Sequence, residues 1–193
     1  MKVLLSCLLV VGLGIVCAPA FLAYSYSGDK VDCVIVMVGD GSGGRIKGAE
    51  QLVERGSSEV LLIPAYNKVA FAEEAGLGEM DYVKMAPVLD KPVTFMGRRY
   101  RVFENTHLEM LKGKMIMDKL GYRSAIIVSS PYHMRRLQLI AGKVFGDDYQ
   151  IGFQATPFEK YDTLGCFRSW KAFENVRSEY LKIGWFLVYS WFV

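Results

Sequence analysis

The sequence lacks the features that mark a zinc protein or a nucleic-acid-binding protein. Its 193 residues include only two histidines and four cysteines, and none of them forms a C-x-x-C or H-x-x-x-H pattern. The spacing therefore predicts no metal site. The formal net charge is only +3, and the one tight basic cluster is Arg98, Arg99 and Arg101. So small and scattered a charge argues against nucleic acid as a partner.

Several enzyme fingerprints are also missing or incomplete. A dinucleotide site needs an acid correctly placed after its glycines, and a P-loop needs a Lys-Ser/Thr end; neither is present. A dinucleotide-dependent oxidoreductase is therefore a weak hypothesis. No G-x-S-x-G elbow is present either. A serine hydrolase built from Ser129 or Ser130 with His133 is disfavoured, because a serine that caps a helix already uses its oxygen on backbone donors.

The N-terminus has no charged residue from Val3 to Tyr26, which is long enough to span a bilayer. Lys2 lies on the short N-terminal side of this stretch, and by the positive-inside rule it favours an orientation with the N-terminus in the cytoplasm. We therefore expect residues 1–27 to form a single-pass anchor in the plasma (inner) membrane. The folded domain, residues 28–193, would then lie on the extracytoplasmic side.

A cleaved signal peptide is the alternative, because Ala18-Pro19-Ala20 also resembles a cleavage site. Both interpretations export the domain. An export compartment permits a disulfide bond between Cys33 and Cys166, but the sequence does not show whether the bond forms.

The strongest internal signal is a strand, a glycine-rich loop and a helix in succession. The uninterrupted apolar run from Val34 to Val38 is typical of a parallel strand covered on both faces. Gly39 and Gly41 follow, and Arg45 opens a helix that ends near Gly56. Free N–H groups, the helix dipole and a guanidinium together favour an anion. The alternative is a tight turn whose glycines serve packing alone.

The rest of the chain alternates between strands and helices, which predicts an α/β fold with a mostly parallel sheet. Expected strands are 59–63, 124–129 and 149–153; expected helices are 69–75, 104–120, 131–145 and 169–192. In the last helix we expect Trp170, Phe173, Val176, Tyr180, Ile183 and Leu187 to be buried. Its apolar end either packs on the sheet, which we favour, or touches the bilayer surface.

Two local patterns bear on the candidate site. Thr106-x-x-Glu109 has the spacing of a capping box. Ser130 is placed to cap a helix whose first residue is Pro131. His133 and Arg136 then lie just past the carboxyl end of a strand, where open α/β sheets bind ligands.

These polar residues make the chain resemble the DUF218 family, the group that includes the YdcF, SanA and ElyC envelope proteins. The matching segments are VIVMVGDGSGGRIKGAEQL, FENTHLEM and VSSPYHMRR, with a weaker match in RSEYLK. The residues that carry the resemblance are Asp40, Arg45, Asn105, Thr106, Glu109, His133 and Arg136. The chain departs from the family at Pro64–Asn67, where a Ser-Gly-Gly-like turn is usual. The resemblance implies a Rossmann-like three-layer α/β/α fold, an N-terminal membrane anchor, a pocket and a place in cell-envelope biogenesis.

We therefore expect a pocket for an anionic, phosphorylated small molecule or lipid-linked precursor. His133 would donate or accept a proton, with Asp40 or Glu109 orienting it or acting as base. The expected ligand-binding residues are Gly39, Gly41, Arg45, Asn105, Thr106, Ser129 and Arg136. The alternative is a non-catalytic, membrane-tethered factor that binds another envelope protein and has a vestigial pocket. The sequence identifies no cofactor.

Overall fold

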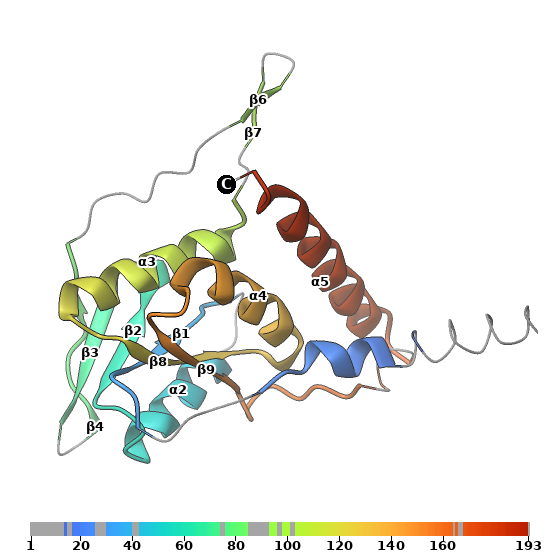
Figure 1. Ribbon diagram of the computed structural model, residues 1–193. Coiled ribbons are helices and arrows are strands. Elements are labelled where there is room, and N and C mark those ends of the chain that lie inside the picture. Colours follow the sequence, from blue (N-terminus) through green and yellow to red (C-terminus); the bar gives the residue numbers. More distant parts are fainter. Residues whose placement is uncertain are drawn as a thin grey trace, which may run out of the picture.

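A computed structural model describes residues 14, 17–25, 30–39, 43–73, 76–84, 93–95, 98–100, 103–163, 165 and 168–192. Its centre is one sheet with the strand order β4-β3-β2-β1-β8-β9, to which β5 is joined through β3 (Figure 1). Four neighbouring strands are parallel: β2 (Val60–Ile63), β1 (Cys33–Val36), β8 (Ser124–Ser129) and β9 (Gln150–Ala155). Three are antiparallel: β3 (Lys68–Glu73), β4 (Gly76–Leu77) and β5 (Asp81–Tyr82).

Helices cover both faces of the sheet, which explains why its central strands are continuously apolar. Val34 and Val36 of β1 pack with Ala49 and Val53 of α2 (Gly44–Glu54). The alternate side chains of β1 pack on the other face, against α3 (Asn105–Leu120) and α4 (Met134–Phe145). The expected α/β fold with a mostly parallel sheet is confirmed. The polar segments between strands and helices therefore meet at the carboxyl edge of the sheet.

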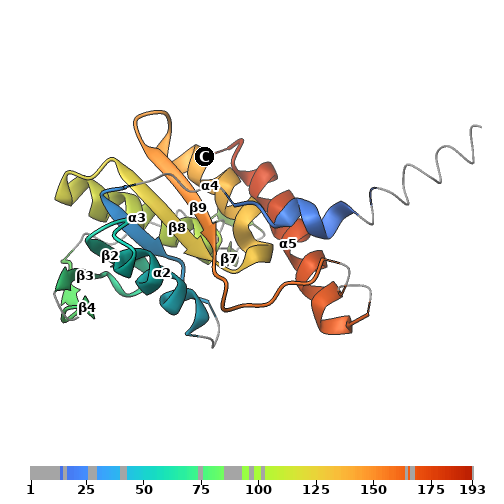
Figure 2. The same cartoon turned by 90° about the horizontal axis from the view of Figure 1, so that it is seen from below.

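The last helix, α5 (Trp170–Tyr189), lies beside α4 and contributes Phe186 and Tyr189 to the core under α3 and α4. The helical residues 17–22 lie beside α5, as Figures 1 and 2 show. Leu22 is buried against Val176 and Ile183 of α5. The packed part of the chain thus extends N-terminal to the boundary expected at residue 28.

No helix among the described residues has the length and apolar character needed to cross a bilayer. Residues 1–13, 15–16 and 26–27 of the expected anchor lie outside the described part of the chain, as does Cys166. Cys33 is buried in β1 with a free thiol.

The helix expected at residues 69–75 is wrong, because Lys68–Glu73 forms strand β3. A short 3₁₀ turn over Pro64–Tyr66 and a left-handed Asn67, with φ of 53°, reverse the chain after β2. The returning segment then pairs antiparallel with β2, and backbone pairing along a full strand outweighs a weak helical propensity.

The expected buried side of α5 is wrong in part. Val176 and Ile183 are buried as expected, but Trp170, Phe173 and Leu187 are exposed. Their places inside are taken by Glu179, Phe186 and Tyr189. α5 is therefore held by hydrogen bonds to Glu179 as well as by the apolar packing of Val176, Ile183, Phe186 and Tyr189.

A separate two-stranded hairpin consists of β6 (Val93–Phe95) and β7 (Arg98–Tyr100). It lies away from the sheet in Figure 1. Within the described residues it contributes nothing to the candidate site.

Candidate functional site

A cavity of about 1060 Å³ lies at the carboxyl edge of β1 and β8. Its walls come from the ends of these strands, the first turns of α2 and α3, the 3₁₀ turn Pro131–His133, the start of α4 and one side of α5. Every expected site residue that the structure describes lines it: Gly39, Arg45, Asn105, Thr106, Glu109, Ser129, His133 and Arg136. Asp40 and Gly41 lie outside the described residues.

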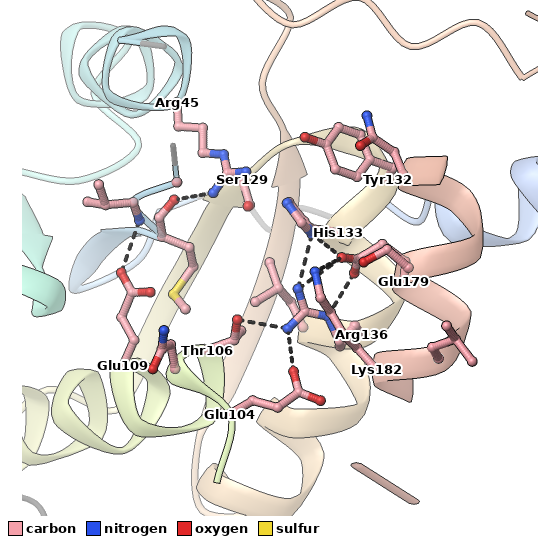
Figure 3. A pocket seen from close by; sticks show the side chains of 18 of the residues that line it. Arg45, Glu104, Thr106, Glu109, Ser129, Tyr132, His133, Arg136, Glu179 and Lys182 are labelled. Atoms are coloured by element: carbon pink, nitrogen blue, oxygen red, sulfur yellow. Dashed lines mark hydrogen bonds and ion pairs between the residues drawn. The ribbon is translucent and has the colours of Figure 1, made fainter. Parts of the chain in front are cut away.

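Arg136 is the hub of one side of the cavity (Figure 3). Its Nε and one terminal nitrogen donate to the two carboxylate oxygens of Glu179, at 2.7 and 3.1 Å. Its other terminal nitrogen donates to Glu104 Oε2 and to Thr106 Oγ1, each at 2.8 Å. Arg136 is only 4% exposed, and all three of its nitrogens already have protein acceptors. Its charge is therefore used to hold the site together rather than left for a ligand.

His133 is oriented by the same carboxylate. Its Nδ1 lies 3.0 Å from Glu179 Oε1 and 3.2 Å from a terminal nitrogen of Arg136. An ionised carboxylate only accepts, so Glu179 favours the neutral tautomer of His133 with its hydrogen on Nδ1, and the Arg136 nitrogen then lies beside Nδ1 without donating to it. Nε2 of His133 is then left with a lone pair on the side of the ring away from Glu179.

The folded protein lowers the pKa of both Glu179 and His133, which favours the charged form of Glu179 and the neutral form of His133. Burial alone would raise the pKa of Glu179, but the hydrogen bonds from His133 and Arg136 and their charges hold it at about 2. Burial lowers the pKa of His133, Glu179 opposes that change, and Arg136 and Arg45 add to it. Glu179 is therefore a permanent anion at neutral pH, whereas His133 is mainly neutral.

Arg45 forms the other side of the cavity. Its Nε donates to Ser130 Oγ at 2.8 Å, and a terminal nitrogen donates to the backbone oxygen of Met37 at 3.0 Å. Glu159 Oε1 lies farther away, at 3.6 Å from Nε, and Glu159 accepts a short hydrogen bond from Ser130. A side chain at position 39 would overlap the guanidinium, so Gly39 leaves the space in which Arg45 lies.

Glu109 lies below Arg45 in Figure 3, across the cavity from His133. Its Oε1 accepts the backbone N–H of Val38 at 2.9 Å. Burial raises the pKa of Glu109 to about 7, although the Val38 bond and the charge of Arg45 both act to lower it. Glu109 can therefore hold or release a proton near neutral pH.

The structure contradicts both expected helix caps. Glu104 is the N-cap residue of α3, and no side chain bonds the free backbone N–H groups there. Thr106 instead accepts from Arg136, and Glu109 accepts from Val38. Ser130 likewise makes no capping bond, because its hydroxyl lies between Arg45 and Glu159. Thr106, Glu109 and Ser130 therefore make hydrogen bonds to groups that line the cavity rather than to the helix ends.

The carboxylates that complete the site were not among the residues predicted from the sequence. Glu179 orients His133, a role that was expected of Asp40 or Glu109. Glu104 also forms an ion pair with Arg136, and Glu159 lies beside Arg45. Lys182 donates to Glu179 at 3.2 Å. Glu179 and Lys182 both lie in the RSEYLK segment, so its weak resemblance was the signal that could have found them.

The cavity wall carries four basic side chains, Arg45, Arg136, Lys160 and Lys182, and four carboxylates, Glu104, Glu109, Glu159 and Glu179. Burial raises the pKa of Glu104, and it raises that of Glu109 to about 7, which reduces the negative charge of Glu109 near neutral pH. Within the described residues, no group of three or more His, Cys, Asp or Glu side chains could hold a metal ion. The arrangement suits an anion and a proton transfer.

Comparisons with protein-family models, with curated proteins and with solved structures each found no match to this chain. The resemblance to the DUF218 family therefore stays a prediction, and the site is interpreted from its own geometry.

Proposed function

We propose that the chain binds a phosphorylated or otherwise anionic small molecule, or the head group of a lipid-linked precursor, in this cavity. We further propose that His133 transfers a proton as the ligand is turned over. The observation that carries the proposal is that Arg45 and the His133–Glu179 pair line one cavity. A docking module without a ligand would not need these groups in one place.

The anion would lie on the Arg45 side of the cavity. Arg45 stands at the start of α2, where free backbone N–H groups and the helix dipole favour negative charge. Among its described contacts, the two hydrogen-bond acceptors within 3.0 Å are uncharged. Lys160 and Lys182 also line the wall and add positive charge. A phosphate or carboxylate there would gain charge-assisted hydrogen bonds.

The proton transfer would use Nε2 of His133. Glu179 is 1% exposed and stays ionised, so it fixes the tautomer and stabilises the imidazolium that forms when Nε2 takes a proton. Glu109, with a pKa of about 7, is the second group able to exchange a proton at neutral pH. His133 and Glu109 would then act as base or acid toward a water molecule or a leaving group held by Arg45.

The cellular setting of the proposal comes from the sequence. We propose a DUF218-type protein tethered by the part of residues 1–27 that lies N-terminal to the residues packed on α5, with its cavity on the extracytoplasmic side of the plasma (inner) membrane and a role in cell-envelope biogenesis. The resemblance in the three segments and the uncharged stretch from Val3 to Tyr26 support this setting.

The test measures the melting temperature of the full chain with inorganic phosphate, nucleotides, sugar phosphates and prenyl phosphates. A ligand at a hundred times its dissociation constant adds about 2.7 kcal/mol, which is readily seen. The ligand that raises the melting temperature is then assayed for turnover with wild type and His133→Asn. Asn can still donate to Glu179 but has no equivalent of Nε2.

We expect His133→Asn to keep the melting shift and to lose roughly 10²- to 10⁴-fold in turnover. No melting shift with any of these ligands would contradict the anion site and favour the non-catalytic tethered factor. A shift without turnover in wild type would keep the binding proposal and remove the proton transfer.

A further inference from the structure

One face of α5 is apolar, exposed and separate from its packed face. Leu181, Trp185 and Val188 follow one another at intervals of four and three residues, so they form one stripe on the helix. They are 66%, 50% and 58% exposed. The opposite side of α5 is the one buried against the domain, through residues such as Ile183 and Phe186. The stripe therefore lies outside the buried side of α5, and the ring of Trp185 lies 5.7 Å from that of Tyr189.

Every tryptophan of the chain lies on or beside this helix. Trp170, Trp185 and Trp191 are the three tryptophans of the sequence, and they are 74%, 50% and 87% exposed. Tryptophan has a large apolar ring with one polar N–H, and it concentrates at the boundary between lipid and water. Phe192, which is 85% exposed, adds to the same end.

The exposed charges on α5 and just before it are mainly positive. Arg168, Lys171 and Arg177 are exposed, and the side chain of Lys182 is 44% exposed. Glu174 is the exposed acid on α5, and it pairs with Arg177 at 3.2 Å. An apolar, aromatic stripe beside basic side chains is the pattern of a helix lying on an anionic lipid surface.

The described N-terminal residues lie next to the same helix. Tyr180 donates to the backbone oxygen of Ala18 at 2.8 Å, and Tyr161 donates to that of Pro19 at 2.8 Å. The uncharged stretch that begins at Val3 leads to this point. A membrane segment there would hold α5 close to the same bilayer.

We propose that α5 lies in the headgroup layer of an anionic bilayer, with Leu181, Trp185 and Val188 inserted. Leu181 and Trp185 also line the cavity, so this placement sets one wall of the cavity at the lipid surface. The contact goes beyond the proposed function, because it depends on the outer face of α5 and not on what the cavity binds.

The test uses the full chain in vesicles of phosphatidylglycerol and phosphatidylcholine whose acyl chains carry bromine near the glycerol. Trp170→Phe with Trp191→Phe leaves Trp185 as the sole tryptophan. Bromine quenches only a ring that touches it, so we expect Trp185 to lose most of its emission and to shift to the blue. Unchanged emission would overturn the proposal. A blue shift that rises with protein concentration in the absence of lipid would also overturn it, by showing that a second copy covers the stripe.

Two variants separate contact from mere proximity to the membrane. Val188→Glu in the same background places a charge in the stripe at a residue that does not line the cavity. It should restore most of the Trp185 emission while leaving the melting temperature unchanged. The second replaces all three tryptophans by Phe and adds Tyr82→Trp, at a 68% exposed position of β5. β5 pairs with β3, which lies across the molecule from α5 in Figure 1. The emission of the tryptophan at position 82 should therefore not change when vesicles are added. Equal quenching of Trp185 and of the tryptophan at position 82 would overturn the proposal.

Discussion

The two arginines of the cavity are used in different ways. Arg136 is enclosed by carboxylates, with Glu179 at 2.7 Å and Glu104 at 2.8 Å. Arg45 donates to a serine hydroxyl at 2.8 Å and to a backbone oxygen at 3.0 Å, and its ion pair with Glu159 is longer, at 3.6 Å. The carboxylates beside the two arginines also differ in their pKa values. Glu179 keeps a pKa of about 2, whereas that of Glu109 is about 7.

This difference assigns separate tasks to the two halves. The Arg136 half is an internally neutralised cluster, so removing one member leaves a buried charge behind. In the Arg45 half, the cation has two uncharged hydrogen-bond acceptors and a longer ion pair with Glu159, and the carboxylate of Glu109 is partly protonated near neutral pH. The first half therefore serves stability and the orientation of His133, and the second is suited to meet a ligand.

The largest effect is expected at Arg136. Arg136→Met leaves Glu179, which is 1% exposed, without its bidentate partner. The free energy of unfolding, measured with urea at neutral pH, should fall by about 3–5 kcal/mol. Arg136→Lys keeps the charge but not the paired geometry and should lose less. A loss below about 1 kcal/mol would show that Lys182 takes over Glu179, and would contradict the division.

The next effect depends on pH and concerns Glu109. Its pKa rises from 4.5 to about 7 on folding, so between these values the folded chain holds a proton that the unfolded chain releases. Glu109 therefore makes the chain lose stability as pH rises from about 4.5 to about 7, by up to about 3 kcal/mol. Glu109→Gln still accepts from Val38 but does not titrate. It should match wild type near pH 4.5 and be more stable at pH 8.

Glu179 acts with the opposite sign and serves as the internal reference. Its pKa falls from 4.5 to about 2 on folding, so its contribution is present above 4.5 and is lost as pH falls toward 2. Urea unfolding of wild type and Glu109→Gln across both ranges separates the two groups. A slope above pH 4.5 that is the same in both proteins would show that Glu109 is not the titrating residue.

Arg45 should matter more for binding than for folding. Arg45→Gln removes the charge opposite an anion, and hydrogen bonds to charged groups contribute about 1.5–3 kcal/mol. The dissociation constant of the anionic ligand, measured by calorimetry, should therefore rise by about 10- to 150-fold. Stability should fall by less than in Arg136→Met. Gly39→Ala is the matched variant, because its methyl group displaces the guanidinium and should weaken the same ligand.

The sequence predicted the central sheet well because its signals there are local. The apolar run after Asp32 and the SAIIVS segment are strands covered on both sides, and no alternative period competes with them. Segment 69–75 was misassigned because its own propensities are weak. Its structure is decided by pairing with β2, a contact that follows the reversal at Asn67.

The candidate site could be predicted only in part. Residues that follow strands in order, such as Arg45 and His133, converge because parallel strands end at one edge of a sheet. Glu179 could not be placed in this way, because it comes from α5, whose buried side combines this carboxylate with Val176, Ile183, Phe186 and Tyr189. A carboxylate at a buried helical position contradicts the expectation that the apolar side faces inward.

Thr106 gives the smallest predicted effect and the sharpest test of how the sequence was interpreted. A capping box would place its hydroxyl on the backbone of α3, whereas in the structure it accepts from Arg136 at 2.8 Å. Thr106→Val removes one hydrogen bond in either case and should cost about 1 kcal/mol of unfolding free energy. Thr106→Ser, which keeps the hydroxyl, should cost little.

The double variant with Arg136→Met decides between the two roles of Thr106. If the hydroxyl serves Arg136, its removal costs almost nothing once the guanidinium has gone, and the two changes couple by about 1 kcal/mol. If the hydroxyl caps α3, it costs the same in both backgrounds and the coupling is near zero. Urea unfolding of the four proteins gives this coupling. A coupling of about 1 kcal/mol would show that a motif with the spacing of a helix cap belongs instead to the network that holds Arg136, and through it His133, in place.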